Sequence, residues 1–310
     1  MCTFVDDCYS VISGKKNEIW KKIENYISTV EKYYTANKLK LNTGKTQILI
    51  LGKNNTTVNG SLLLDGTTVT NSQNIKILGT IFSQAGNWNA NVSSGSNCFL
   101  TQLKCRANVV VRTAKNFDLK FKLQLFDSLL VGKIRYILPT WGNVNMKFKN
   151  KINNIMLNTV KKLTKNLYVG RTIKFIMREN KILDYFQLHS NACFKQTFSL
   201  LNNNDKNFAS SLLAEARTIR NVSQNKCGPL IGDIGWTLFS QNTYLYRMKT
   251  QYNKLPRQLT LSPNFKLFKK WLQTYTFNKD TKLPDRKDNH TYYHLLDVDM
   301  DAVSRCTGSN

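Results

Sequence analysis

An α+β fold is predicted by two contrasting parts of this 310-residue sequence, which meet near residue 95. Before this point, short runs of aromatic and β-branched residues indicate strands joined into hairpins. Among them, Asp65-Gly66 separates residues 62–64 from residues 67–69 and is typical of a type I′ turn. After residue 95, apolar residues recur at helical spacing. Residues 89–96 are polar and small, so we expect a connector there.

Two long amphipathic helices are predicted in the second part of the chain. Over residues 118–138 the apolar positions form one broad face, and Pro139 is expected to end the helix. Residues 152–163 repeat this pattern, with lysines on the opposite face. We interpret both apolar faces as contributions to a hydrophobic core.

The first dozen residues hold the most informative pattern in the chain. Asp6 and Asp7 lie between two strand-like runs, residues 2–5 and 8–12, which places both carboxylates in the tight connection of a hairpin. Adjacent carboxylates repel each other unless a divalent cation lies between them, and their hard oxygen atoms suit Mg²⁺. Nucleotidyl transfer uses such a site, in which two metals clamp the attacking and leaving oxygens. The alternative is a solvated turn, because turns favour Asp.

Three segments follow the acidic hairpin in order. Helical spacing of apolar residues predicts a helix that Asn17 caps and that ends near Asn37. A polar loop that contains Lys45 then leads into the strand-like residues 47–52. Residues 75–82 are predicted to form another strand, with Gly79 at its middle.

This ordered set resembles the C-terminal half of the palm of a reverse transcriptase of the non-LTR (LINE-like) retrotransposon type. Phe4-Val5-Asp6-Asp7 resembles the metal-binding hairpin of that family, Leu41-Asn42 to Lys45-Thr46 its Lys-bearing loop, and Leu78-Gly79 its primer-grip turn. More weakly, residues 134–142 are similar to the segment that closes the thumb helices. Residues 252–256 and 265–269 are similar to the region after the thumb.

The resemblance implies a fold and a domain organisation. Residues 1–95 would form a partial palm of antiparallel hairpins plus one helix, and residues 96–182 a basic, helical thumb-like domain. Residues 183–310 would form a mostly helical C-terminal region of unknown role.

The resemblance also implies an RNA-directed DNA polymerase of a retrotransposable element. Asp6 and Asp7 would be catalytic residues and ligands of Mg²⁺, or of Mn²⁺ in its place. Lys45 would lie near the triphosphate of the incoming deoxynucleoside triphosphate, although a lysine on a strand edge is an equal alternative. Leu78 and Gly79 would position the primer end. The expected partners are an RNA template and a DNA primer.

One departure from the family pattern limits this expectation. The metals in the family are also held by an Asp on an earlier palm strand, whereas the hairpin begins here at residue 3. We therefore expect this chain to be a truncated polymerase that is inactive alone, so that Asp6→Asn changes nothing measurable in it. The missing N-terminal part of the same polyprotein is an expected partner.

Charge favours a polyanionic partner. The chain carries 45 Lys and Arg against 19 Asp and Glu, a formal net charge of +26. Residues 104–181 alone hold 18 cations and three acids. Phosphate contacts dominate nucleic-acid affinity, so we expect a nucleic-acid-binding surface in this stretch. Its candidate residues are Lys104, Arg106, Arg112, Lys161, Lys162 and Lys165. The alternative is a merely solvated basic face.

Two other functions remain open at this stage. The chain could be a non-catalytic nucleic-acid-binding remnant that keeps the basic helices, or a pseudogene product without function. The sequence offers no apolar run long enough to span a membrane and no signal peptide pattern, so we expect an intracellular protein without a membrane partner. Nuclear or cytoplasmic localisation fits, and the family implies nuclear action.

Overall fold

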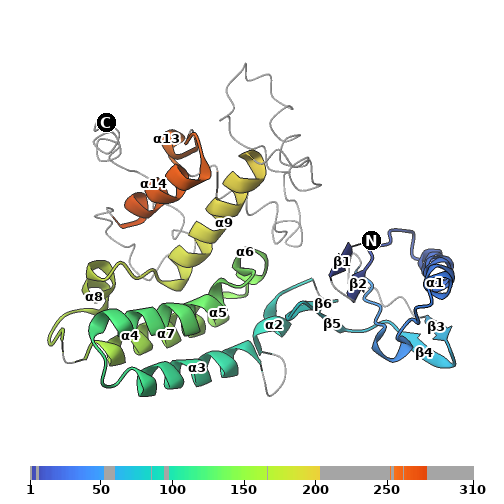
Figure 1. The fold of residues 1–310 in the computed structure, drawn as a ribbon, viewed down its shortest axis with the longest axis horizontal. Helices are drawn as coiled ribbons and strands as arrows, with labels where there is room; N and C mark the ends of the chain where they lie inside the picture. Colours follow the sequence, from blue (N-terminus) through green and yellow to red (C-terminus); the bar gives the residue numbers. More distant parts are fainter. Residues whose placement is uncertain are drawn as a thin grey trace. The chain divides into compact units, whose positions relative to one another are not determined.

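The structure is a computed structural model and describes residues 2–4, 7–51, 60–84, 86–93, 98–165, 167–202, 252, 255–260 and 262–277. The chain divides into two compact units, Met1–Ala90 and Asn91–Asn310. Within them, short antiparallel hairpins and many helices give the mixed α+β character that the sequence predicts (Figure 1). No helix in the described ranges has the length and apolar character needed to cross a membrane. The assignment of three domains stays a prediction.

The described strands of the first unit form three separate two-stranded antiparallel sheets. The pairs are β1 (Cys2–Phe4) with β2 (Asp7–Tyr9), β3 (Ser61–Leu64) with β4 (Thr67–Thr70), and β5 (Asn74–Ile77) with β6 (Thr80–Ser83). Between β3 and β4, Asp65 and Gly66 have φ angles of 44° and 77°. Positive φ at both central positions defines the type I′ turn, so that prediction is confirmed.

The prediction of a single strand over residues 75–82 is wrong. Ile77 pairs with Thr80, so Leu78 and Gly79 form the two-residue turn of the β5–β6 hairpin. Their φ angles are 46° and 81°. Leucine rarely adopts the left-handed conformation, so local residue preference does not indicate a turn at Leu78, and only the family resemblance led us to expect one there.

Helix α1 (Ile19–Ala36) covers the β3–β4 hairpin. Its buried residues Ile19 and Ile23 belong to a core cluster with Ile48, Leu62, Leu64 and Val69. Asn37 ends the helix, as predicted, and its side chain donates a 2.8 Å hydrogen bond to the Tyr33 carbonyl. The predicted cap Asn17 is wrong. Glu18 stands at the start of α1 and makes no side-chain capping bond, because a turn precedes the helix.

Residues 47–51 do not form the predicted strand. They follow the short 3₁₀ helix η1 (Thr43–Lys45) and make a single parallel bridge, between Ile48 and Asn71. The Ile50 amide donates to the side-chain oxygen of Asn71 at 2.9 Å. Because a side chain takes the place of the backbone acceptor, the strand ladder stops after one bridge.

All the regular elements described in the second unit are helices. A short helix, α2 (Asn89–Ser93), lies at the boundary of the units in the sequence, within the connector predicted over residues 89–96. The helices that follow are α3 (Phe99–Thr113), α4 (Leu119–Leu125), η3 (Phe126–Val131), α5 (Gly132–Arg135), α6 (Leu138–Trp141), α7 (Met146–Leu163), α8 (Ile173–Glu179), α9 (Tyr185–Asn202), α13 (Arg257–Thr260) and α14 (Phe265–Phe277).

The predicted helix over residues 118–138 is interrupted. Asp118 caps it by accepting a 2.8 Å bond from the Phe121 amide, but η3 is a π-helix and α5 ends at Arg135. Pro139 does not end the helix and instead lies in the first turn of α6. Proline has no amide hydrogen to donate, which is tolerated in a first turn because those amides lack helical partners.

Two sets of contacts form the core of the second unit. Helix α3 packs against α7 and η3, and α9 packs against α6 and α7. Trp141 of α6 is buried there, and its indole nitrogen donates to the Tyr136 carbonyl at 2.7 Å. Farther along α9, Phe194 and Phe198 pack with Phe268 and Leu272 of α14 in a second cluster.

Candidate functional site

The acidic hairpin begins with the pairing of Phe4 and Asp7, which leaves two residues between the strands. Asp7 is therefore the first residue of β2, and its side chain is exposed. Asp6 lies outside the described residues. The hairpin expected from the first dozen residues is present, but Asp7 lies in strand β2 and not in the connection between the strands, where it was predicted.

Tyr9 links Asp7 to the turn between β5 and β6. Its hydroxyl donates a 3.0 Å hydrogen bond to Asp7 Oδ2, since residues two apart on a strand share a face. Burial, this hydrogen bond and the negative charge of Asp7 raise the pKa of Tyr9, while a backbone hydrogen bond with Leu78 lowers it. One hydroxyl thus contacts both the acidic hairpin and the Leu78-Gly79 turn.

This contact brings together two segments that lie about seventy residues apart in the sequence. It was missed at the sequence level, where Tyr9 counted only as a strand-forming residue. Leu78 also holds a left-handed conformation that is strained for a residue with a side chain. Strained backbone of this kind clusters at ligand clamps and active sites.

Two tyrosines of helix α1 contact strand β2 and the residue that follows it. Tyr34 Oη lies 2.8 Å from Cys8 Sγ, and Tyr26 Oη hydrogen bonds with Ser10 Oγ. The two tyrosines are two helical turns apart and so share one face of α1. The hydrogen bond with Cys8, followed by burial, raises the pKa of Tyr34 to about 12. Strand β2 therefore has a fixed position on the helix that follows it.

Lys45 is the last residue of η1, and its side chain is exposed. Its backbone amide donates to Asn42 Oδ1 at 3.2 Å, which fixes the loop. No ion pair joins Lys45 to Asp7 in the described part of the chain. Proximity of Lys45 to the acidic hairpin stays a prediction.

The donor set at the hairpin is only partly suited to a metal pair. No group of three or more His, Cys, Asp or Glu side chains that could hold a metal ion occurs among the described residues. The oxygen atoms of Asp7 are of the type that Mg²⁺ prefers, but one carboxylate does not hold two metals. Its neighbour Asp6, beyond the described set, is the adjacent candidate ligand.

The predicted nucleic-acid-binding residues occupy two helices that pack together. Lys104, Arg106 and Arg112 lie on α3, Lys161 and Lys162 lie in the last turn of α7, and Lys165 follows α7. All six residues are exposed. Arg106 also donates to the Leu129 carbonyl at 3.2 Å, so part of its guanidinium is engaged within the protein.

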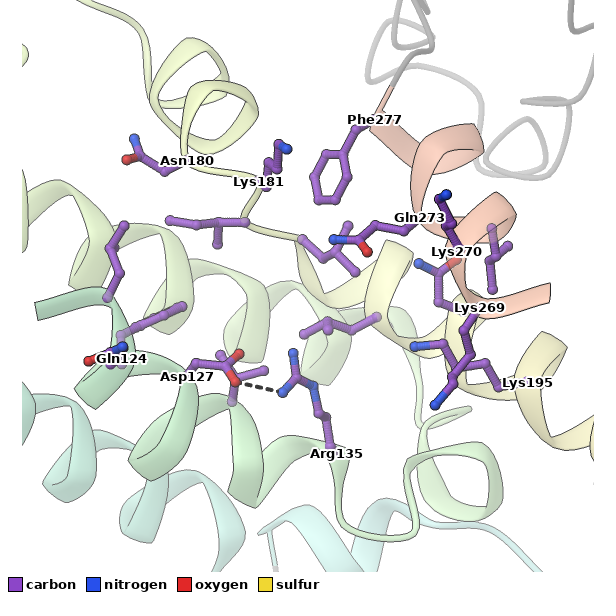
Figure 2. A pocket seen from close by; sticks show the side chains of 18 of the residues that line it. Gln124, Asp127, Arg135, Asn180, Lys181, Lys195, Lys269, Lys270, Gln273 and Phe277 are labelled. Atoms are coloured by element: carbon purple, nitrogen blue, oxygen red, sulfur yellow. Dashed lines mark hydrogen bonds and ion pairs between the residues drawn. The ribbon is translucent and has the colours of Figure 1, made fainter. Parts of the chain in front are cut away.

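A basic pocket in the second unit was not found from the sequence. It has a volume of about 760 Å³ and lies among α4, η3, α9 and α14 (Figure 2). Its cations come from residues as far apart as Lys120 and Lys270. The only sequence signal was the Lys269-Lys270 pair near the middle of α14.

Comparison of the chain with protein-family models, curated proteins and solved structures finds no match. The class that the fold defines is therefore an α+β protein with a hairpin-rich first unit and a basic helical second unit. Any narrower function is a proposal.

Proposed function

We propose that this chain is part of an RNA-directed DNA polymerase of a non-LTR retrotransposable element. In this proposal the first unit supplies the part of the palm that holds the primer end beside the acidic hairpin. The observation that carries it is the Tyr9 hydroxyl, which bonds to Asp7 and to the backbone of Leu78. The resemblance assigns a metal ligand to Asp7 and a primer contact to Leu78.

The chemistry of nucleotidyl transfer demands this proximity. The primer 3′-hydroxyl has to lie within bonding distance of the incoming phosphate, and positioning alone supplies a large part of such an acceleration. Asp6 and Asp7 would hold Mg²⁺ or Mn²⁺, which neutralises charge on the attacking and leaving oxygens. The Leu78-Gly79 turn would orient the primer end, and Lys45 would contact the triphosphate.

The test is RNA-templated DNA synthesis by the protein that the native transcript encodes, including any reading frame upstream of Met1. We expect Asp7→Asn to lower the rate by about 100-fold or more, since a metal ligand is lost. The control is Asp65→Asn, which removes an exposed carboxylate that pairs with Lys40 at 3.7 Å in the β3–β4 turn. Synthesis that survives Asp6→Asn and Asp7→Asn together would overturn the proposal.

A second candidate is nucleic-acid binding without catalysis, which the six exposed cations of α3, α7 and Lys165 favour. Each phosphate contact releases about one counterion from the nucleic acid, so binding weakens steeply as salt rises. This function needs neither metal nor the acidic hairpin. It would persist in a protein that shows no polymerase activity.

We predict that neutralising Lys161, Lys162 and Lys165 to Gln weakens binding of a template-primer duplex. The slope of log affinity against log salt should fall by roughly 2–3 units, because up to three phosphate contacts are lost. A charge-matched control replaces the exposed Lys16, Lys21 and Lys32 of the first unit. An unchanged slope in the first variant, measured by fluorescence anisotropy, contradicts the assignment.

A further inference from the structure

The basic pocket of the second unit combines many cations with few acids. Six of its described lining residues are Lys or Arg, and one, Asp127, is acidic. Asp127 is already paired, since its Oδ2 accepts a 2.8 Å bond from Arg135 Nη1. Figure 2 shows Arg135 between Asp127 and the neighbouring Lys195 and Lys269. The pocket therefore keeps a strong excess of positive charge.

Lys195 lies in an unfavourable environment without a ligand. It is half-buried on α9, and burial together with the positive charges of Arg135 and Lys269 lowers its pKa. Desolvation and like charges both destabilise an ammonium group. An anion bound among these three cations would offset both effects, and natural proteins keep such costs where function needs them.

The rest of the wall is apolar or carries amides. Phe277, Leu123 and Leu183 provide apolar surface, and Gln124 and Gln273 provide amide groups that both donate and accept hydrogen bonds. Ligand pockets of about 300–1,000 Å³ with a few convergent polar groups are typical of small-molecule sites. The π-helix η3 also contributes to the wall, and π-turns recur at functional sites.

We propose that this pocket binds a nucleotide, with its phosphates among Arg135, Lys195 and Lys269 and its base against the apolar wall near Phe277. Charge selects the phosphates, and the apolar surface with its amides suits a base. The ligand is either a free nucleotide or the phosphorylated end of a strand, since both present the same groups. The pocket lies in the second unit and involves no residue of the acidic hairpin, so this inference stands independently of the polymerase assignment.

The experiment is calorimetric titration of the full chain with ATP, with inorganic tripolyphosphate and with adenosine. We expect ATP to bind more tightly than either fragment, and Lys195→Gln with Lys269→Gln to weaken ATP at least about tenfold through loss of charge-assisted bonds. The charge-matched control is Lys147→Gln with Lys174→Gln, two exposed lysines outside the pocket. Equal losses in both double variants would mean non-specific attraction to a basic protein and would overturn the proposal.

Two further measurements keep the result interpretable. Lys195→Met should raise the melting temperature of the ligand-free chain, because a desolvated and repelled charge is removed, so lost binding is not due to unfolding.

Tripolyphosphate that binds as tightly as ATP would overturn the role of the apolar wall. A 5′-phosphorylated trinucleotide that competes with ATP, against its 5′-hydroxyl form, assigns the ligand to a strand end, and competition by free nucleotides alone assigns it to those.

Discussion

Asp184 illustrates how one residue couples helix capping to pH. Its carboxylate accepts a 2.8 Å hydrogen bond from the backbone amide of Gln187, and Gln187 Oε1 accepts a 3.1 Å hydrogen bond from the backbone amide of Asp184. This reciprocal pair forms a capping box at the start of α9. Burial raises the pKa of Asp184 above its ordinary value of 3.8, although backbone bonds from Gln187 and Phe186 act in the opposite direction.

The raised pKa predicts a stability that falls as pH rises. The folded state holds the proton more tightly than the unfolded state, so this contribution is fully present below pH 3.8 and is lost as pH rises through the folded pKa. Asp184→Asn keeps a good capping residue and removes the titration.

We therefore expect the free energy of unfolding of Asp184→Asn, relative to that of the wild-type chain, to rise as pH increases above 3.8, as measured by urea unfolding at each pH. Glu179→Gln, which neutralises an exposed acid at the end of α8, is the charge-matched control. If the wild-type chain instead becomes more stable relative to Asp184→Asn as pH rises, the assignment of a raised pKa to Asp184 is contradicted.

At the scale of elements, the junction of α6 and α9 depends on a glycine. The Tyr185 hydroxyl of α9 donates a 2.6 Å bond to the Gly142 carbonyl, and Tyr185 is fully buried. A Cβ at Gly142 would collide with the ring of His189 and would stand 2.5 Å from the Leu138 carbonyl oxygen. Backbone cannot yield as a flexible side chain can, so the junction admits only glycine.

Gly142→Ala should lower the free energy of unfolding by about 1–3 kcal/mol, the usual cost of overpacking. The matched control is Gly132→Ala, where the nearest atom, the Asp127 carbonyl oxygen, is 3.5 Å from the new Cβ and the backbone is helical. That variant should gain about 0.5–1 kcal/mol from helix propensity. Equal effects of the two substitutions in denaturant unfolding would contradict the packing account.

Elements were predictable where local chemistry decided them. Asp65-Gly66 specified its turn and Asn37 its helix end, because both features depend on neighbouring residues alone. Local preference predicts neither the turn at Leu78 nor helix α6, which begins at Leu138, since leucine rarely adopts a positive φ and proline more often ends a helix than begins one.

The candidate sites divide in the same way. The acidic hairpin could be found because its two carboxylates are adjacent in the chain. The contact of Tyr9 with the Leu78 backbone and the basic pocket join residues far apart in the sequence, so no local pattern could reveal them. Only the folded arrangement shows which polar groups converge.

At the scale of the whole molecule, the first unit presents one candidate site and the second presents two. The first unit brings an acidic hairpin and a strained turn together through Tyr9, and the second carries exposed basic helices and a basic pocket. A net charge of +26 favours polyanions as partners of the protein. The central claim is that the hairpin and the turn belong to one metal-dependent site.

Paramagnetic broadening by Mn²⁺ in an NMR spectrum of the chain tests this claim most directly, because Mn²⁺ replaces Mg²⁺ at oxygen ligands. We predict that Mn²⁺ broadens the amide signals of Tyr9, Leu78 and Gly79 together, and that Asp6→Asn with Asp7→Asn removes the broadening at all three. Sharp signals from Leu78 and Gly79 beside a broadened Tyr9, or broadening that survives the double substitution, would contradict it.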